Sequence, residues 1–512
     1  MALHPGTGAF AQVYDQGKAQ VVWTDLVADL ETPVSAMLKL AGRPEASSGN
    51  FAPNSFLLES VERGANRGRY SIVGVRPDVI WRCKGNVAEI ARDADAGAPK
   101  FVKSSDGALA SLRALVRESR IDLPPELPPM ASALVGYAGY DMVRLVERIP
   151  SKNPDVLGVP DGVFVRPTVM AIFDSVKDVV TIVTPVWPKP GVSASQALAR
   201  ATERLNRAVE DLDRPLHIPQ ATADVSSLPE PTSNRTRAEY HAMVEKAKEY
   251  IRAGDIFQVV PSQRMKFPFS LPPFALYRAL RRTNPSPFMF FLDFGGFAVV
   301  GSSPEVLVRL RDTTVSIRPI AGTRPRGATH AEDERLAEEM LADPKERAEH
   351  LMLLDLGRND VGRVAQIGSV KVTDQMIVER YSHVMHIVSN VEGKIDPKHD
   401  AMDALLAGFP AGTVSGAPKV RAMEIIDELE NERRGIYAGA VGYLSANGSM
   451  DTCIALRTAV IKDGTMYVQA GGGVVLDSDP EAEYQETRNK AKALLRAAEE
   501  AVRFATAGDK SL

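Results

Sequence analysis

The stretch that constrains the fold of this chain most strongly is a β-rich run near its C-terminus. Three segments rich in β-forming residues, 435–445, 449–462 and 465–475, are separated by Asn447-Gly448 and Asp463-Gly464. These dipeptides suit tight hairpin turns, because their residues tolerate the positive φ angles that such turns need. The run therefore predicts a meander of three antiparallel strands.

The last of these segments leads into a glycine triplet and a helix start. Residues 471–473 are all glycine, so a ligand can approach the backbone closely there. Asp479-Pro480 predicts a helix with aspartate as its cap and proline at its first position. Glu483 and Glu486 follow three residues apart, which places both carboxylates on one face of that helix.

A second helix start upstream has the same pattern. Asp343-Pro344 is followed by Glu346 and Glu349. Two pairs of carboxylates, without a cluster of cysteine or histidine, suit a hard cation such as Mg²⁺ that prefers oxygen ligands. The alternative interpretation is two solvated helix starts, where acidic residues offset the helix dipole.

Composition bounds the class of protein. The 512 residues exceed the length of about 250–300 at which single cores stop growing, and 61 basic against 65 acidic residues give no electrostatic case for nucleic acid or an anionic membrane. Cys83 and Cys453 are too few for a disulfide framework and suit a reducing cytoplasm. The most apolar window, 288–300, is shorter than the ~20 residues of a membrane span. We therefore expect a soluble, cytoplasmic protein.

A change of composition predicts the main boundary in the chain. Residues 213–234 are rich in Pro, Ser and Thr and show no periodicity, which indicates a linker. It separates an N-terminal region, residues 20–212, from a second region, residues 235–505. The first 20 or so residues carry no strong pattern, and we expect them to be partly disordered.

Nine short segments of the second region follow one another in a characteristic order. They are GDIFQVVPSQR (254–264), NPSPFMFFL (284–292), GSSPEVLV (301–308), PIAGTRPRG (319–327), DPKERAEHLMLLDLGRND (343–360), YSHVMH (381–386), FPAGTVSGAPK (409–419), DTCIALRT (451–458) and DPEAEYQETRNK (479–490). Together they resemble the chorismate-binding enzymes, and within them the large subunits of anthranilate synthases. The resemblance implies a two-lobed α/β (α+β) fold of antiparallel β-sheets flanked by helices, which holds chorismate and Mg²⁺ in a cleft.

The resemblance also implies roles for particular residues. The implied metal ligands are Glu346, Glu349, Glu483 and Glu486. The implied substrate-binding residues are Gly322, Thr323, Tyr437, Arg457, Gly471, Gly472 and Gly473. Arginine suits a substrate with two carboxylates, because its fork pairs with a carboxylate bidentately. The implied catalytic residues are Glu305, His386, Thr413 and Lys490.

Several of these residues have simpler interpretations. His386 lies in a β-like run, where a lone histidine is often a satisfied core residue, and His383 would face the other side of that strand. Arg457 would then be a surface charge on an edge strand. Lys490 would form an ordinary helical ion pair with Glu486, four residues before it.

The implied reaction has two steps. Ammonia adds at C2 of the chorismate ring while the C4 hydroxyl leaves. Glu305 is the implied general acid, so burial or neighbouring carboxylates should raise its pKa. Pyruvate is then eliminated to give anthranilate, the first step of tryptophan biosynthesis, and His386 is the histidine implied at that step.

Relatives that use water carry a lysine in the segment that holds Gln258, and aminodeoxychorismate synthases carry one in place of Ala321. The runner-up functions are aminodeoxychorismate synthase component I and a non-catalytic regulatory protein that binds an amino acid.

The sequence also predicts partners. Neither Cys83 nor Cys453 lies on the Gly-flanked turn that a glutaminase nucleophile needs, so ammonia should come from a separate glutamine amidotransferase subunit. The family resemblance implies a hetero-oligomer of two large and two small subunits. It also implies feedback inhibition by tryptophan through a pocket made by Pro33, Leu58, Glu59, Ser60, Asn284, Pro285, Ser286, Met289 and Cys453. Phe288 replaces the tyrosine that is common in this family.

Overall fold

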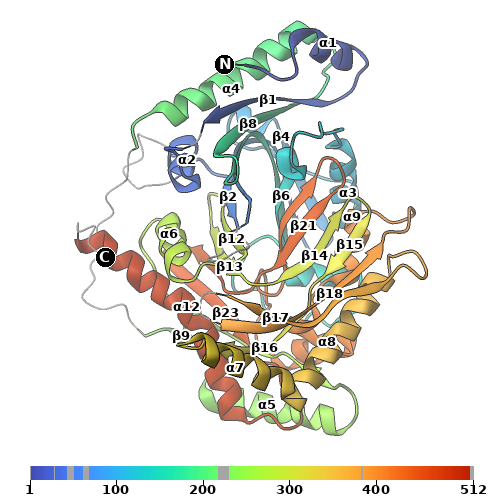
Figure 1. The fold of residues 1–512 in the computed structure, drawn as a ribbon, viewed down its shortest axis with the longest axis vertical. Helices are drawn as coiled ribbons and strands as arrows, with labels where there is room; N and C mark the ends of the chain where they lie inside the picture. The colour runs from blue at the N-terminus through green and yellow to red at the C-terminus, as the bar shows by residue number, and fades with distance from the viewer. Residues whose placement is uncertain are drawn as a thin grey trace.

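A computed structural model describes residues 2–27, 29–42, 51–60, 68–216, 230–381 and 384–507. One large sheet of 21 strands runs through the molecule, and a ribbon of two strands stands beside it. Helices surround the sheet (Figure 1), and the strand pairings within the described residues are antiparallel. The structure therefore confirms the predicted class of antiparallel sheets flanked by helices.

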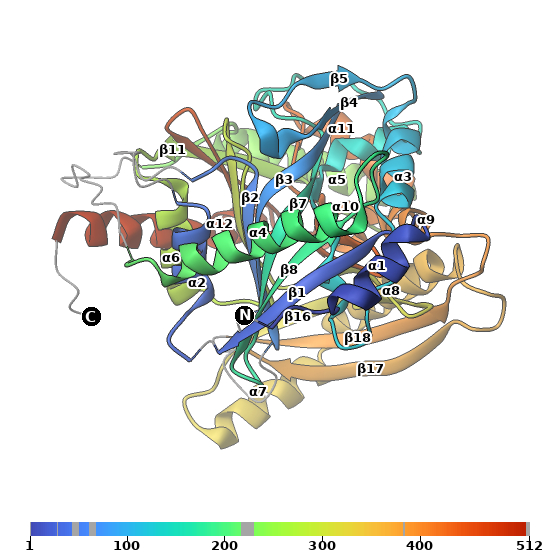
Figure 2. The ribbon, with the colours of Figure 1, turned by 90° about the horizontal axis from the view of Figure 1, so that it is seen from above.

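The N-terminal region contributes strands of the sheet and, among its described residues, the helices α1 to α4. Its elements are α1 (Thr7–Asp15), β1 (Gln20–Val27), α2 (Pro33–Leu40), β2 (Ser55–Glu59), β3 (Tyr70–Lys84), β4 (Val87–Arg92), β5 (Phe101–Lys103), α3 (Ala108–Glu118), β6 (Ala133–Ala138), β7 (Gly162–Asp174), β8 (Val179–Val186) and α4 (Ala194–Asp213). Helix α4 lies across β1, β7 and β8 (Figure 2). The expected disorder of the first 20 residues is wrong, because α1 buries Phe10 and Tyr14 in the core.

The second region supplies the rest of the sheet and the long helices. Its elements are β9 (Thr232–Ser233), α5 (Arg237–Arg252), β10 (Gln258–Val259), β11 (Ser262–Pro268), α6 (Pro273–Thr283), β12 (Phe288–Asp293), β13 (Ala298–Ser303), β14 (Val306–Arg311), β15 (Thr314–Ile317), β16 (Ile320–Pro325), α7 (His330–Ala342), α8 (Pro344–Gly362), β17 (Lys371–Arg380), β18 (Val384–Lys394), α9 (Ala401–Gly408), α10 (Gly412–Ser415), β19 (Gly416–Ala417), α11 (Lys419–Leu429), β20 (Ala440–Ser445), β21 (Met450–Ile454), β22 (Thr458–Lys462), β23 (Thr465–Gly471) and α12 (Pro480–Ala507).

The predicted meander contains four strands and not three. Both predicted turns are present, but the middle segment breaks between β21 and β22, where Arg457 adopts a φ of +47°. The break lets each half find its own partner. Strand β21 pairs with β14, whereas β22 pairs with β13.

The two regions share the sheet. Strand β2 pairs with β12, and β6 pairs with β20 along its whole length. Residues 217–229, most of the predicted linker, lie outside the described residues. The boundary at residues 213–234 therefore stays a prediction, and strand pairing does not divide the sheet there.

The two acidic helix starts are capped as the sequence predicts. The carboxylate of Asp343 accepts hydrogen bonds from the peptide N–H groups of Lys345 and Glu346, and that of Asp479 accepts one from Ala482. These caps hold the first turns of α8 and α12 in place. None of the helices in the described part of the chain has the length and apolarity that crossing a bilayer requires.

Candidate active site

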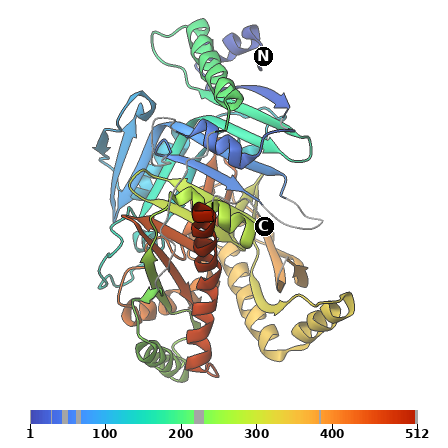
Figure 3. The same ribbon diagram turned by 90° about the vertical axis from the view of Figure 1, so that its left-hand side faces the viewer.

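A cavity of about 850 Å³ lies among α8, α12 and the ends of several strands. Helices α8 and α12 both lie in the lower half of the molecule in Figure 3. Of the residues that the resemblance implied for catalysis, substrate binding and the metal, the cavity brings together Glu305, Gly322, Thr323, Glu346, Glu349, His386, Thr413, Tyr437, Arg457, Gly471, Gly473, Glu483, Glu486 and Lys490. Gly472 lies directly behind the lining, where an added Cβ would stand 2.6 Å from the Glu483 Oε2 atom.

Glu305 is a buried acid just after the end of β13. Its Oε1 atom accepts a hydrogen bond of 3.1 Å from the hydroxyl of Thr413 on α10. Burial raises the pKa of Glu305 to about 8, although the Thr413 hydroxyl, the Ile320 peptide and the charge of Lys490 act against that rise. The expectation that burial raises this pKa is confirmed, and the side chain is a neutral proton donor at pH 7.

His386 is positioned by strand β16. Its Nδ1 atom lies 2.9 Å from the carbonyl oxygen of Gly322 and 3.1 Å from the hydroxyl of Thr323. Since a carbonyl only accepts, this pattern assigns the proton to Nδ1 and leaves Nε2 as an acceptor. Burial lowers the pKa of His386, so the ring is a neutral base. His383, which we expected to face the other side of the strand from His386, lies outside the described residues.

The four glutamates line the cavity in two pairs. Burial and the charges of Glu346 and Glu486 raise the pKa of Glu349. Burial and the charge of Glu486 raise the pKa of Glu483, whose buried Oε2 atom has no hydrogen-bond partner in the described part of the chain. Crowded carboxylates with an unpartnered oxygen are the donor set that a hard divalent cation would satisfy.

Basic side chains of the protein pair with the other two carboxylates. Glu346 pairs with Arg324 at 2.8 Å, and Glu486 pairs with Lys490 at 2.7 Å. Within the described ranges, no three His, Cys, Asp or Glu side chains are grouped closely enough to hold a metal ion. Ligation by all four glutamates therefore stays a prediction. Arg324 was not singled out from the sequence, although its place two residues after Gly322 on β16 was a signal.

Arg457 faces the cavity from the break between β21 and β22. Burial lowers the pKa of its guanidinium, and no acidic partner is present for it among the described residues. The interpretation as a surface charge on an edge strand is therefore wrong. A desolvated guanidinium without a counterion is a site for an anionic group.

A further part of the lining is formed by Gly471, Gly473, Gln258 and Lys490. Lys490 donates to the carbonyl oxygen of Gly471 at 2.9 Å. It lines the cavity and also forms the predicted helical ion pair with Glu486. A Cβ added to Gly473 would stand 2.6 Å from the Gln258 Nε2 atom, so a larger residue there would displace the end of the Gln258 side chain. The side-chain oxygen of Gln258 is buried without a partner in the described chain.

The segments predicted to bind tryptophan lie side by side. Strand β2 pairs with β12, in the register Glu59 with Met289 and Leu58 with Phe290. Glu59 is buried and accepts hydrogen bonds from Arg281 at 2.8 and 3.0 Å and from the Tyr277 hydroxyl.

The other residues of this set are spread over several elements. Pro33 is the first residue of α2, and Cys453 is buried in β21 opposite Val306. The peptide oxygen of Asn284 accepts from the Ser302 hydroxyl at 2.6 Å, and the Ser286 hydroxyl donates to the peptide oxygen of Ser303. The role of these residues in feedback stays a prediction.

A family model described as chorismate binding enzyme matches residues 62–496. The chain belongs to the chorismate-binding enzymes. Within this family it is similar to anthranilate synthase component 1 of Cereibacter sphaeroides, with 61% identity over 97% of this chain and 98% of the relative. The Pseudomonas putida protein of the same name is 49% identical over 92% of this chain and 94% of its own length.

Solved structures of this family agree with the fold. Anthranilate synthase component I from Streptococcus pneumoniae matches with a TM-score of 0.73 at 37% identity, covering 92% of this chain and 98% of that chain. The isochorismate synthase MenF from Escherichia coli matches with a TM-score of 0.68 at 20% identity, covering 96% of this chain and 99% of that chain, and this likeness shows the fold alone. The resemblance drawn from the sequence segments is confirmed.

Proposed function

We propose that this chain is the large subunit of an anthranilate synthase, which converts chorismate and ammonia to anthranilate, pyruvate and water. The observation that supports this most directly is one cavity that holds a protonated acid, a neutral histidine and an unpaired arginine. Ammonia is the proposed nucleophile because the segments at Gln258 and Ala321 carry no lysine.

In the first proposed step, ammonia forms a bond to C2, the C4–oxygen bond breaks, and the new ammonium group loses one proton to solvent. Glu305 donates its proton to the departing hydroxyl, which leaves as water. In the second step, His386 accepts the C2 proton at Nε2, the bond from C3 to the enolpyruvyl oxygen breaks, and the enolate takes up a proton to become pyruvate. The ring is then aromatic.

The two carboxylates of chorismate need separate counter-charges. Glu346, Glu349, Glu483 and Glu486 would hold Mg²⁺, and the bound ion would neutralise the ring carboxylate. Arg457, the Tyr437 hydroxyl and the backbone of residues 471–473 would hold the enolpyruvyl carboxylate. The Oε2 atom of Glu483, which has no hydrogen-bond partner among the described residues, supports the proposed metal site.

We also propose the partners that the family implies. A separate glutamine amidotransferase subunit would supply ammonia, in an assembly of two large and two small subunits, and tryptophan would inhibit. Both cysteines are buried and unpaired, which suits work in the reducing cytoplasm.

The test is product identity. The purified chain is incubated with chorismate, Mg²⁺ and ammonium, and products are separated by chromatography and read by fluorescence and mass. We expect anthranilate and an equal amount of pyruvate. Aminodeoxychorismate without pyruvate would instead identify the runner-up enzyme, and unchanged chorismate would favour a non-catalytic protein. Arg457→Gln serves as the matched inactive variant.

A further inference from the structure

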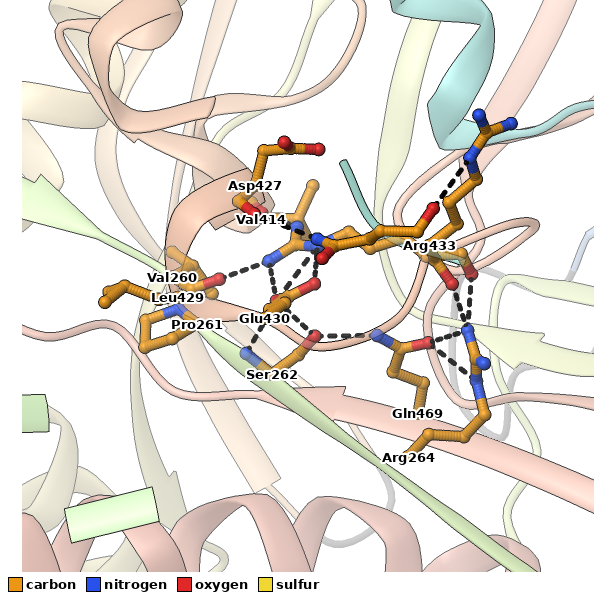
Figure 4. A network of polar contacts seen from close by, with 12 residues as sticks. Val260, Pro261, Ser262, Arg264, Val414, Asp427, Leu429, Glu430, Arg433 and Gln469 are labelled. Atoms are coloured by element: carbon orange, nitrogen blue, oxygen red, sulfur yellow. Dashed lines mark hydrogen bonds and ion pairs between the residues drawn. The ribbon is translucent and has the colours of Figure 1, made fainter. Parts of the chain in front are cut away.

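A completely buried arginine lies behind the wall of the cavity. Arg434 follows α11 and pairs with Glu430 at 2.7 Å. Its Nη1 atom donates to the carbonyl oxygen of Val414 at 2.7 Å, and its Nη2 atom donates to that of Val260 at 2.6 Å. Val260, Val414 and Glu430, the three partners of this guanidinium, are labelled in Figure 4.

The two carbonyls belong to two segments of the cavity lining that are distant in the sequence and adjacent in space. Val414 follows Thr413, whose hydroxyl donates to Glu305. Val260 follows β10, and its peptide N–H donates to the carbonyl of Ser415 at 3.0 Å. Val260 and Val414 both line the cavity. One guanidinium therefore links the turn beside the proposed general acid to the residue after β10, next to the hydrogen bond that joins these two segments.

The same ion pair reaches further lining residues. The guanidinium carbon of Arg434 lies 5.4 Å from the centre of the Tyr437 ring, within the range of a cation–π contact. Glu430 accepts from the peptide N–H and the hydroxyl of Ser262 at 2.9 and 2.7 Å, and that hydroxyl accepts from Gln469 at 2.8 Å. Tyr437 and Gln469 both line the cavity.

A buried ion pair is weak evidence for a role in stability, because well-packed apolar residues often serve equally well in its place. A planar fork that donates to two carbonyls in different directions is something that arginine provides and lysine does not. What distinguishes this ion pair is that its arginine donates to the carbonyls of two cavity-lining segments. Its charge alone does not distinguish it.

We propose that Arg434 is a positioning residue for the chorismate reaction, which sets the placement of Thr413, Tyr437 and the Val260 strand from behind the cavity. This inference rests on the proposed function for its chemical consequence, and on geometry alone for the anchoring. A displacement of about 1 Å in such groups can reduce a rate about 100-fold.

The test removes the anchor while leaving no lone charge. Arg434→Met/Glu430→Gln loses both charges and keeps an acceptor for Ser262. Its control is Arg166→Met/Asp78→Gln, which removes a bidentate ion pair from the N-terminal region, outside the cavity. Both variants and the unchanged chain are compared by thermal unfolding, by hydrogen exchange with mass spectrometry, and by kcat and KM for chorismate.

We expect faster hydrogen exchange in peptides 258–262 and 411–416 of the Arg434 variant, unchanged exchange in peptide 163–173, and a kcat lowered about 10–100-fold. The control should keep its kcat. If the unchanged chain makes no anthranilate but the exchange pattern appears, the proposed function fails and the anchoring stands.

A folded Arg434 variant with unchanged exchange or unchanged kcat would overturn the proposal. If that variant does not fold, Arg434→Lys decides the question, since an ammonium keeps the charge without the fork. We expect the lysine variant to show the same faster exchange and a lower kcat at nearly unchanged melting temperature. Full activity of the lysine variant would mean that charge alone suffices and would also overturn the proposal.

Discussion

Burial acts in opposite directions on the two titratable groups proposed for the chemistry. It raises the pKa of Glu305 to about 8 and lowers the pKa of His386. Both side chains are therefore neutral at pH 7, one with a proton to give and the other with a lone pair to accept one. One cavity therefore holds an acid and a base that do not neutralise each other.

The Glu305 acid gives a prediction about pH. The acid must be protonated to act, so kcat should fall as the pH rises through about 8, and Glu305→Gln should lower kcat by about 10²–10⁴. The folded-state pKa of Glu305 is raised above its ordinary value of 4.5. The free energy of unfolding of the parent protein should therefore fall as the pH rises from about 4.5 toward 8. The free energy of unfolding of Glu305→Gln should therefore exceed that of the parent by a margin that grows between pH 5 and 8. A margin that stays constant would contradict the raised pKa.

His386 should separate the two steps. With no base at Nε2, His386→Ala should still aminate chorismate but eliminate pyruvate about 10²–10⁴ times more slowly. Rapid quenching and mass analysis should then show the amino intermediate accumulating. Equal loss of chorismate consumption and pyruvate release would point to a structural role for the histidine.

Glu483 carries the prediction about the metal. Glu483→Gln should raise the Mg²⁺ concentration for half-maximal turnover about 10–100-fold, by analogy with the losses seen on mutating groups around metal ligands. Without metal, it should raise the melting temperature at pH 8, since burial and Glu486 disfavour the ionised form of Glu483. Glu481→Gln is the matched control on the same helix, because Glu481 pairs with Arg237 and His241 outside the cavity. Identical Mg²⁺ dependence in the two variants would remove Glu483 from the metal site.

At the scale of elements, the β2–β12 pair changes how feedback should be tested. Ser60→Ala should raise the tryptophan concentration for half-inhibition and leave uninhibited turnover nearly intact. Glu59→Ala is a poor probe, because it would leave Arg281 and Tyr277 without their buried acceptor and cost about 3 kcal/mol of stability. Inhibition curves and melting temperatures of both variants check this, and unchanged inhibition in Ser60→Ala would place the effector elsewhere.

Elements with local signals were predictable from the sequence. The caps Asp343 and Asp479 and the two hairpin turns depend on neighbouring residues only, and the structure has them as expected. The break at Arg457 depends on the distant partners β13 and β14, which no local pattern reveals. Helix α1 was missed because it is held by packing of Phe10 and Tyr14 against α4.

The candidate site was predictable for a different reason. Its residues come from strands and helices far apart in the sequence, so spacing alone could propose only the two glutamate pairs. Glu305, His386 and Arg457 were found through family segments. The anchor at Arg434 was missed, because an arginine beside four other charged residues in ELENERRG is the pattern expected of a solvated stretch.

At the scale of the whole molecule, the nitrogen source can be tested. The buried cysteines have pKa values raised by burial, to about 12 for Cys83, so neither is a ready thiolate nucleophile. The chain alone should make anthranilate from ammonium, best on the alkaline side of neutral up to about pH 8, where free ammonia increases and Glu305 still holds its proton, and none from glutamine. Adding a glutamine amidotransferase subunit should restore glutamine use. Glutamine-dependent turnover by the isolated chain, free of contaminating amidotransferase, would contradict this.

The pairing of β6 with β20 has a consequence for synthesis of the protein. Strand β6 is buried throughout, and its partner lies about 300 residues later in the chain. At a ribosomal rate of about 5–20 residues per second, this apolar edge waits about 15 s to a minute for its partner to emerge. An uncovered edge strand invites association with other nascent chains. Newly made molecules should therefore depend on chaperones that hold this edge until the ribosome has passed Ser445.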